Sequence, residues 1–251
     1  DGPTLLSYLE AVPVAADRNL ASFRYPVQLV LRPDLSYRGY CGQIASGVVR
    51  KGDEVCVLPS GKRTTVAAID TYDGELDEAF APMSVTLRLS DDIDVSRGDM
   101  IVFPNDQPVT ARRIEADVVW MSETPLDLER SYLLKHTTRT VRVHVDAVIG
   151  KLDLDTLERS PTSAFDLNDI GRLQLSCNQA LQIDSYADNR QTGAFILIDA
   201  QTNNTVAAGM IVRSLLEAES VAEPTTRSQV SPQERSELAG HSAIVVWFVG
   251  E

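Results

Sequence analysis

The stretch Ser60-Gly61-Lys62-Arg63-Thr64 comes nearest to a phosphate-binding loop in this sequence. Such a loop reads G-x-x-x-x-G-K-[ST]: its backbone cradles the phosphates and its final hydroxyl binds Mg²⁺. Cys56 stands where the first glycine belongs, and Arg63 stands where the hydroxyl residue belongs. We therefore predict that this stretch is the tip of a β-hairpin and does not bind GTP.

Patterns for metal binding and nucleophilic catalysis are weak. The histidines form no H-x-H or H-x-x-x-H pair, and the odd number of cysteines includes no C-x-x-C; these residues are His136, His144, His241, Cys41, Cys56 and Cys177. Asp91, Asp92 and Asp94 lack the spacing of a calcium loop, which favours a solvated turn. We assign no catalytic residue and no metal ligand, and we expect the cysteines to be small buried side chains in a reducing compartment.

The stretch RPDLSYRGY, from Arg32 to Tyr40, is the strongest candidate for an interaction site. Arginine and tyrosine are enriched at protein interfaces. We predict that Arg32, Arg38 and Tyr40 contact a neighbouring domain or subunit. An edge strand with solvated arginines is an equally open interpretation.

The elements that must position these residues are mostly strands. Apolar residues alternate with polar ones in short segments separated by turns, at 26–32, 38–49, 53–58, 64–69, 83–90, 111–122, 139–149, 170–178, 194–200 and 205–212. Spacing of this kind predicts two consecutive all-β sandwiches or barrels. Residues 3–12 predict a short helix, and 231–241 predict another, followed by a strand at 243–249 that is buried on both faces.

Composition excludes several function classes. The 251 residues include 23 Lys and Arg against 36 Asp and Glu, a net charge of −13, which argues against a nucleic-acid partner. No apolar run approaches the roughly 20 residues that span a bilayer, and the first residues do not have the pattern of a secretory signal. We therefore expect a cytoplasmic protein with no membrane partner.

The order of these segments resembles that of translation-factor-type GTPases. More closely, RPDLSYRGYCGQIASGVVRKGDEV (32–55), DIDVSRGDMI (92–101) and FDLNDIGRLQLSCNQAL (165–181) resemble the large subunit of bacterial sulfate adenylyltransferase, a GTPase related to elongation factor Tu. The resemblance implies an all-β fold of two barrels like domains 2 and 3 of that factor. It divides the chain into the last helix of a GTPase domain (1–14), two barrels (15–106 and 107–214), and a linker leading into an adenylylsulfate kinase domain (215–251).

The resemblance also sets expectations about activity. In this family the small subunit makes adenosine 5′-phosphosulfate from ATP and sulfate, and GTP hydrolysis on the large subunit drives the reaction. The barrels would then couple GTP hydrolysis on the large subunit to the reaction on the small subunit without being catalytic themselves. The Arg32–Tyr40 stretch would sense the nucleotide state of the GTPase domain. A translation-factor barrel pair and a pure interaction scaffold remain as alternatives.

The same resemblance places the start of a second nucleotide site near Gly250, as the first glycine of a kinase phosphate loop. Val249 and Glu251 depart from the family pattern there, and a carboxylate beside bound phosphates is unfavourable. GTP, ATP and Mg²⁺ are thus expected for an intact protein, with none of them held by the two barrels.

Overall fold

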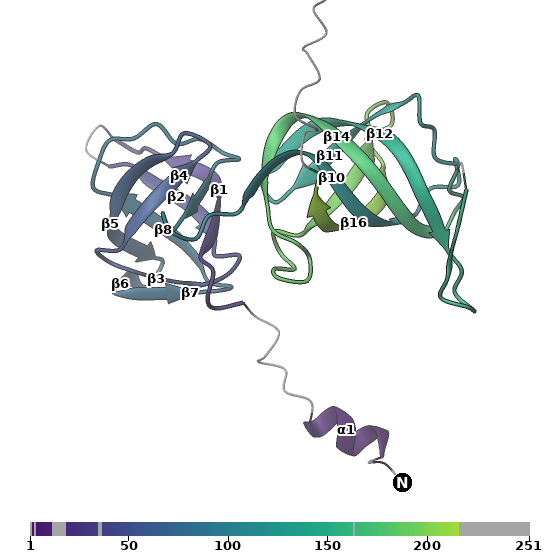
Figure 1. The fold of residues 1–251 in the computed structure, drawn as a ribbon. Helices are drawn as coiled ribbons and strands as arrows, with labels where there is room; N and C mark the ends of the chain where they lie inside the picture. The colour runs from purple at the N-terminus through teal and green to yellow at the C-terminus, as the bar shows by residue number, and fades with distance from the viewer. Residues whose placement is uncertain (1, 3, 12–18, 35–36, 163, 216–251) are drawn as a thin grey trace, which may run out of the picture. The chain divides into compact units, whose positions relative to one another are not determined.

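The structure is a computed structural model that describes residues 2, 4–11, 19–34, 37–162 and 164–215 (Figure 1). All described helices and strands belong to one compact unit within residues 1–215. The predicted helix and strand at 231–249, and Gly250, lie outside the described residues.

The first barrel runs from Arg24 to Val102. Its sheet has the order β4-β9-β1-β2-β8-β5, and a further antiparallel pairing of β5 with β4 closes it. Strand β6 adds to β5, and β3 pairs with β7 as a separate ribbon. The strands are β1 (Arg24–Leu31), β2 (Gly39–Gln43), β3 (Val48–Arg50), β4 (Glu54–Leu58), β5 (Lys62–Thr71), β6 (Gly74–Leu76), β7 (Glu78–Phe80), β8 (Ser84–Leu89) and β9 (Met100–Val102).

The second barrel runs from Val109 to Ser214. Its order is β11-β15-β16-β10-β14-β12, and the pairing of β12 with β11 closes it, while β13 adds to β12. The strands are β10 (Val109–Trp120), β11 (Ser131–His136), β12 (Arg139–Leu152), β13 (Arg159–Ser160), β14 (Ile170–Ile183), β15 (Ala194–Asp199) and β16 (Thr205–Ser214). The predicted fold class of two consecutive β-barrels is therefore confirmed.

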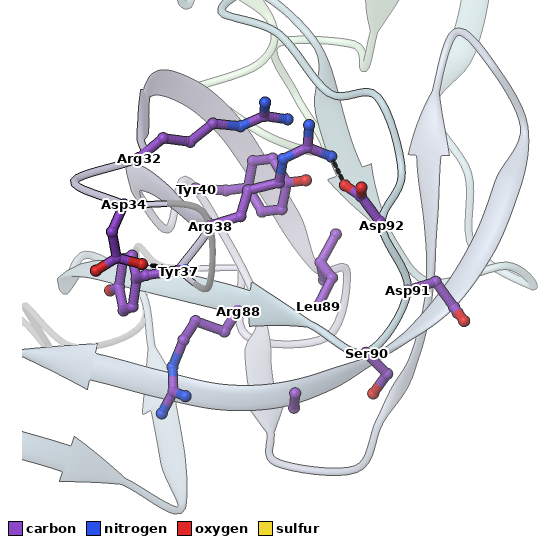
Figure 2. Close-up of a pocket in the computed structure, with 11 residues that line it drawn as sticks. Arg32, Asp34, Tyr37, Arg38, Tyr40, Arg88, Leu89, Ser90, Asp91 and Asp92 are labelled. Carbon is purple, nitrogen blue, oxygen red and sulfur yellow. Dashed lines mark hydrogen bonds and ion pairs between the residues drawn. The ribbon is translucent and has the colours of Figure 1, made fainter.

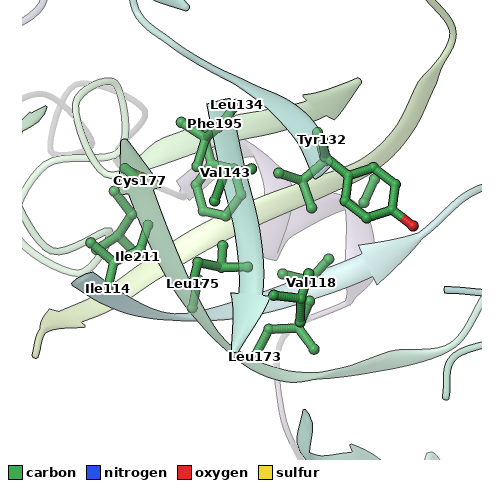
Figure 3. Close-up of a cluster of buried hydrophobic side chains, with 14 of the residues drawn as sticks. Ile114, Val118, Tyr132, Leu134, Val143, Leu173, Leu175, Cys177, Phe195 and Ile211 are labelled. Carbon is green, nitrogen blue, oxygen red and sulfur yellow. The ribbon is translucent and has the colours of Figure 1, made fainter. Parts of the chain in front are cut away.

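Alternation of side chains explains why these segments form barrel strands. In the first half of β12 every second residue points inward, so that Val141, Val143 and Val145 are buried whereas Arg142, His144 and Asp146 are exposed. Each barrel thereby fills its own interior. Figure 3 shows the second of these cores, in which Val118, Leu175 and Phe195 pack together. Each fully buried side chain of this size contributes about 1.5–3 kcal/mol through the hydrophobic effect.

The segment 38–49, in which the glycines at 39, 42 and 47 suggest bends or bulges within a strand, forms two strands instead of one. The segment divides into β2 and β3, and the chain turns between them. Gly47 has a φ of 79°, and a Cβ at this position would come within 2.5 Å of the Phe23 backbone. The turn therefore needs a residue without a side chain, and it lets Ile44 enter the core.

Two smaller expectations are met in part. A helix, α1 (Leu5–Ala11), lies within the predicted range 3–12, and none of its residues is buried. Cys56 and Cys177 are buried free thiols, and burial raises the pKa of Cys177 to about 12. Cys41 is only half-buried, because it lies on the outer side of β2, where the Thr86 hydroxyl donates a hydrogen bond to its Sγ. In the described part of the chain, no helix has the length and apolar character to cross a membrane.

Candidate functional site

The predicted arginine and tyrosine residues line a hollow on the first barrel, with a volume of about 470 Å³ (Figure 2). The hollow is formed by the segment after β1, the start of β2 and the end of β8. Its lining residues are Arg32, Asp34, Tyr37, Arg38, Tyr40, Ala67, Arg88, Leu89, Ser90, Asp91 and Asp92. The structure thus brings together residues more than 50 positions apart in the sequence, which no local pattern could reveal.

Arg38 is held at the wall of this hollow by one of its terminal nitrogens. Its Nη1 donates to the carbonyl oxygen of Ile93 at 2.8 Å and also forms an ion pair with Asp92. The Arg38 side chain is 23% exposed, whereas that of Asp92 is 85% exposed. A carboxylate so open to water contributes little to an ion pair, because solvent screens the interaction.

Tyr40 has a structural role. The residue is 1% exposed, and its hydroxyl donates to the Ile93 carbonyl at 2.8 Å, so its ring belongs to the barrel core. Tyr40 and Arg38 together fix the loop that follows β8. The prediction that Tyr40 itself contacts a partner therefore needs correction, since almost none of its surface reaches solvent. For Arg32 and Arg38, which are accessible, contact with a neighbour stays a prediction.

Tyr37 and Arg88 line the hollow beside Arg32 and Arg38, and both bind the same carboxylate, that of Asp70. Tyr37 lies against Gly39, where a Cβ would come within 2.9 Å of the tyrosine ring. Its hydroxyl donates to Asp70 at 2.9 Å, and Arg88 binds the same carboxylate with Nε at 2.9 Å and Nη2 at 3.2 Å. Burial, followed by the hydrogen bond to Asp70, raises the pKa of Tyr37. The charge of Arg88 is therefore already balanced.

The stretch at 60–64 forms the hairpin between β4 and β5, as predicted. Gly61 has a φ of 72° at the tip, and the Thr64 hydroxyl donates to Asp91 at 2.8 Å. That hydroxyl is therefore engaged within the barrel, and a hairpin offers no helix N-terminus to phosphates. These residues do not fit GTP. In the described ranges, no group of three or more His, Cys, Asp or Glu side chains could hold a metal ion.

A polar cluster that the sequence did not reveal connects the two barrels. Arg24, at the start of β1, is 3% exposed and binds Asp184 of the second barrel, with Nε–Oδ2 and Nη2–Oδ1 distances of 2.9 and 3.0 Å. Its Nη1 donates to the carbonyl oxygen of Asp106 in the connection between the barrels. Burial alone would lower the pKa of Arg24, but the hydrogen bond and charge of Asp184 raise it above its ordinary value.

Further hydrogen bonds extend this cluster into the second barrel. Asn189 donates through Nδ2 to the Ser46 hydroxyl of the first barrel at 2.7 Å. The Thr192 hydroxyl donates to Asp184, and the Thr192 carbonyl lies 2.6 Å from Nε2 of His136. Burial lowers the pKa of His136, so the ring is neutral at pH 7 and Nε2 is the donor to that carbonyl.

Comparison with known proteins identifies where this pair of barrels occurs. Residues 113–212 match the family model described as GTP-eEF1A C-terminal domain-like. Sulfate adenylyltransferase subunit 1 of Bacteroides fragilis (strain YCH46) is 49% identical over 212 residues, which are 84% of this chain and 44% of that protein. The bifunctional enzyme CysN/CysC of Mycobacterium tuberculosis (strain ATCC 25618 / H37Rv) is 46% identical over 259 aligned residues, covering 100% of this chain and 41% of that protein. The chain is homologous to part of sulfate adenylyltransferase subunit 1.

Similarity to this subunit extends to other bifunctional proteins. CysN/CysC of Rhodopirellula baltica is 51% identical over 84% of this chain and 33% of its own length. The chain thus spans less than half the length of these curated relatives. Among solved structures, Sup35 complexed with GDP shares the fold with a TM-score of 0.71 at 24% identity, over 86% of this chain and 53% of that chain.

Proposed function

We propose that these barrels belong to the large subunit of a GTP-dependent sulfate adenylyltransferase and couple its GTPase domain to a small, ATP-handling subunit. The small subunit would form adenosine 5′-phosphosulfate from ATP and sulfate, and the barrels would provide no catalytic group. The identity of 46–51% to proteins named sulfate adenylyltransferase subunit 1 or CysN/CysC carries this proposal.

The arrangement of the barrels supports a mechanical role. Arg24 and Asn189 link the two barrels through buried polar contacts, so a displacement of one barrel is transmitted to the other. Coupling of two distant sites requires elements that move as units. GTP, ATP and Mg²⁺ would bind to other parts of the intact protein and its partner, because the hairpin at 60–64 lacks the features of a phosphate loop.

Binding to the small subunit tests this proposal directly. The purified chain is mixed with the small subunit of a sulfate adenylyltransferase in a pull-down, and any complex is characterised by calorimetry. We expect a 1:1 complex in the absence of GTP. Failure to bind would contradict the docking role of the barrels.

Two control measurements separate this role from a role in translation. GTP titrated into the chain should give no heat of binding. A filter-binding assay with tRNA should show no retention, as the net charge of −13 predicts. Salt-dependent retention of tRNA, together with no binding to the small subunit, would favour a translation-factor role instead.

A further inference from the structure

We infer that the hollow on the first barrel binds the phosphate or sulfate group of a small molecule through Arg32 and Arg38. The inference concerns residues of this chain alone and does not depend on the proposed function. Its starting point is the set of guanidinium donors in the hollow, which outnumber the acceptors that the described residues offer them.

Arg38 has more hydrogen-bond donors than the described acceptors around it can use. A guanidinium group has five N–H donors in a fixed planar arrangement, and two adjacent ones bind a carboxylate or phosphate in parallel. Two hydrogen bonds of Arg38 use Nη1, with the Ile93 carbonyl and Asp92 as acceptors. The Tyr40 hydroxyl also forms a hydrogen bond with this guanidinium group. These contacts orient the side chain, and its five donors outnumber the three acceptors that the described residues supply.

Arg88 shows how such a donor pair is satisfied within the same hollow. Its Nε and Nη2 bind the two oxygens of Asp70, the arrangement that an oxyanion would adopt at Arg38. Asp91 and Asp34 are engaged elsewhere, since Asp91 accepts from the Thr64 hydroxyl and Asp34 accepts from the backbone N–H of Tyr37. These contacts engage both carboxylates within the first barrel.

Arg32 adds a second positive charge. It directly follows β1 and lines the hollow, and in the described part of the chain no hydrogen bond or ion pair engages its guanidinium group. In Figure 2 the ends of Arg32 and Arg38 lie on the same side of the hollow, above Tyr40. Two guanidinium groups without a buried carboxylate between them attract an anion and are stabilised by it.

The size of the hollow indicates what carries the anionic group. A volume of about 470 Å³ is far more than a bare sulfate ion fills. It falls within the range of roughly 300–1,000 Å³ that is typical of sites for small organic ligands. We therefore expect a phosphorylated or sulfated small molecule to bind more tightly than the inorganic ion.

Asp92 competes with such a ligand. Its carboxylate is the one acidic side chain of the hollow that pairs with Arg38 among the described residues, and it is largely exposed. An incoming oxyanion would displace it from Nη1 or bind despite its negative charge. Replacing Asp92 by asparagine should thus strengthen binding, an effect that damage to the fold would not produce.

The test is a titration of the ¹⁵N-labelled chain with inorganic phosphate, inorganic sulfate and AMP, followed by the NMR signals of arginine Nε–H groups. Chloride keeps the ionic strength constant. We expect saturable shifts of the Arg32 and Arg38 signals. Arg32→Gln and Arg38→Gln should each weaken binding about tenfold, the effect of losing a charge-assisted hydrogen bond. Asp92→Asn should tighten it.

Matched variants in the same barrel provide the controls. Arg63→Gln, at an exposed ion pair with Glu54, changes the net charge as Arg32→Gln and Arg38→Gln do. Asp73→Asn, in the exposed turn after β5, changes it as Asp92→Asn does. Both control substitutions should leave binding unaltered. Tighter binding of AMP than of phosphate supports a small-molecule ligand, whereas equal affinities support a free oxyanion. Shifts that never saturate, or equal affinities in Arg38→Gln, Asp92→Asn and the controls, would overturn the inference.

Discussion

Replacement of Arg24 by methionine should destabilise the chain far more than replacement of an exposed arginine. Methionine retains much of the length and apolar stem of the side chain but cannot donate a hydrogen bond. The change removes both bonds to Asp184 and the bond to the Asp106 carbonyl. Asp184, whose side chain is only 14% exposed, would keep Thr192 as a donor.

The size of the effect follows from this burial. Breaking a buried ion pair by removing one partner costs about 3–5 kcal/mol, because the other charge is left without compensation. The matched control is Arg50→Met, since Arg50 is 64% exposed and pairs with Glu78, which is 45% exposed. An exposed pair contributes about 0–1 kcal/mol.

Urea unfolding monitored by circular dichroism measures both free energies. Arg24→Met should lower the free energy of unfolding by about 3–5 kcal/mol, and Arg50→Met by less than about 1 kcal/mol. Arg24→Met/Asp184→Asn should lose less than the sum of the two single variants, because the second change removes the uncompensated charge. Equal losses for Arg24→Met and Arg50→Met would refute the reasoning.

Three further predictions concern the second barrel. Burial holds the pKa of His136 below its ordinary value, so below about pH 6.5 the unfolded chain binds a proton that the folded chain does not. The free energy of unfolding should therefore fall as the pH drops below about 6.5, by at most about 1.4 kcal/mol per pH unit. Urea unfolding at several pH values should show this dependence in the original chain and not in His136→Gln. Gly209→Ala places a Cβ within 2.2 Å of the Phe195 ring, and this overpacking should cost about 1–3 kcal/mol in thermal unfolding, part of which Phe195→Leu should restore. Arg172→Gln removes two hydrogen bonds of 2.9 Å to Asp117 and should lower the free energy of unfolding by about 1–3 kcal/mol in a urea titration; no loss would show that Arg159 alone suffices for this carboxylate.

The sequence predicts the barrels well because barrel strands need only an alternating pattern. The segments 139–149 and 83–90 form β12 and β8, and their alternating valines and Leu87 are buried, since each pattern is local. Gly47 suggests a bend within 38–49, but the sequence does not show that this bend separates two strands, because the close approach of Phe23 is a tertiary contact.

The candidate site was predicted only in part for the same reason. The residues from Arg32 to Tyr40 are distinctive in composition, and they do line a hollow. No local signal shows that Tyr40 points into the core while Arg38 stays at the surface, because Gly39 between them has no side chain that would mark the apolar face of the strand. The link between Arg24 and Asp184 spans 160 positions, and an arginine at the start of a strand looks like any solvated residue.

Closure of both barrels has a consequence for how the chain behaves at high concentration. A sheet exposes unpaired backbone groups only along its edges, and those edges recruit strands from other molecules. In the described ranges the strands left with an open side are the appended strands β6 and β13 and the ribbon of β3 and β7, all two or three residues long. Templates this short cannot hold a foreign strand in register. The folded barrels should therefore resist amyloid-like growth even when crowded, and within the described ranges aggregation would begin only where a barrel has opened.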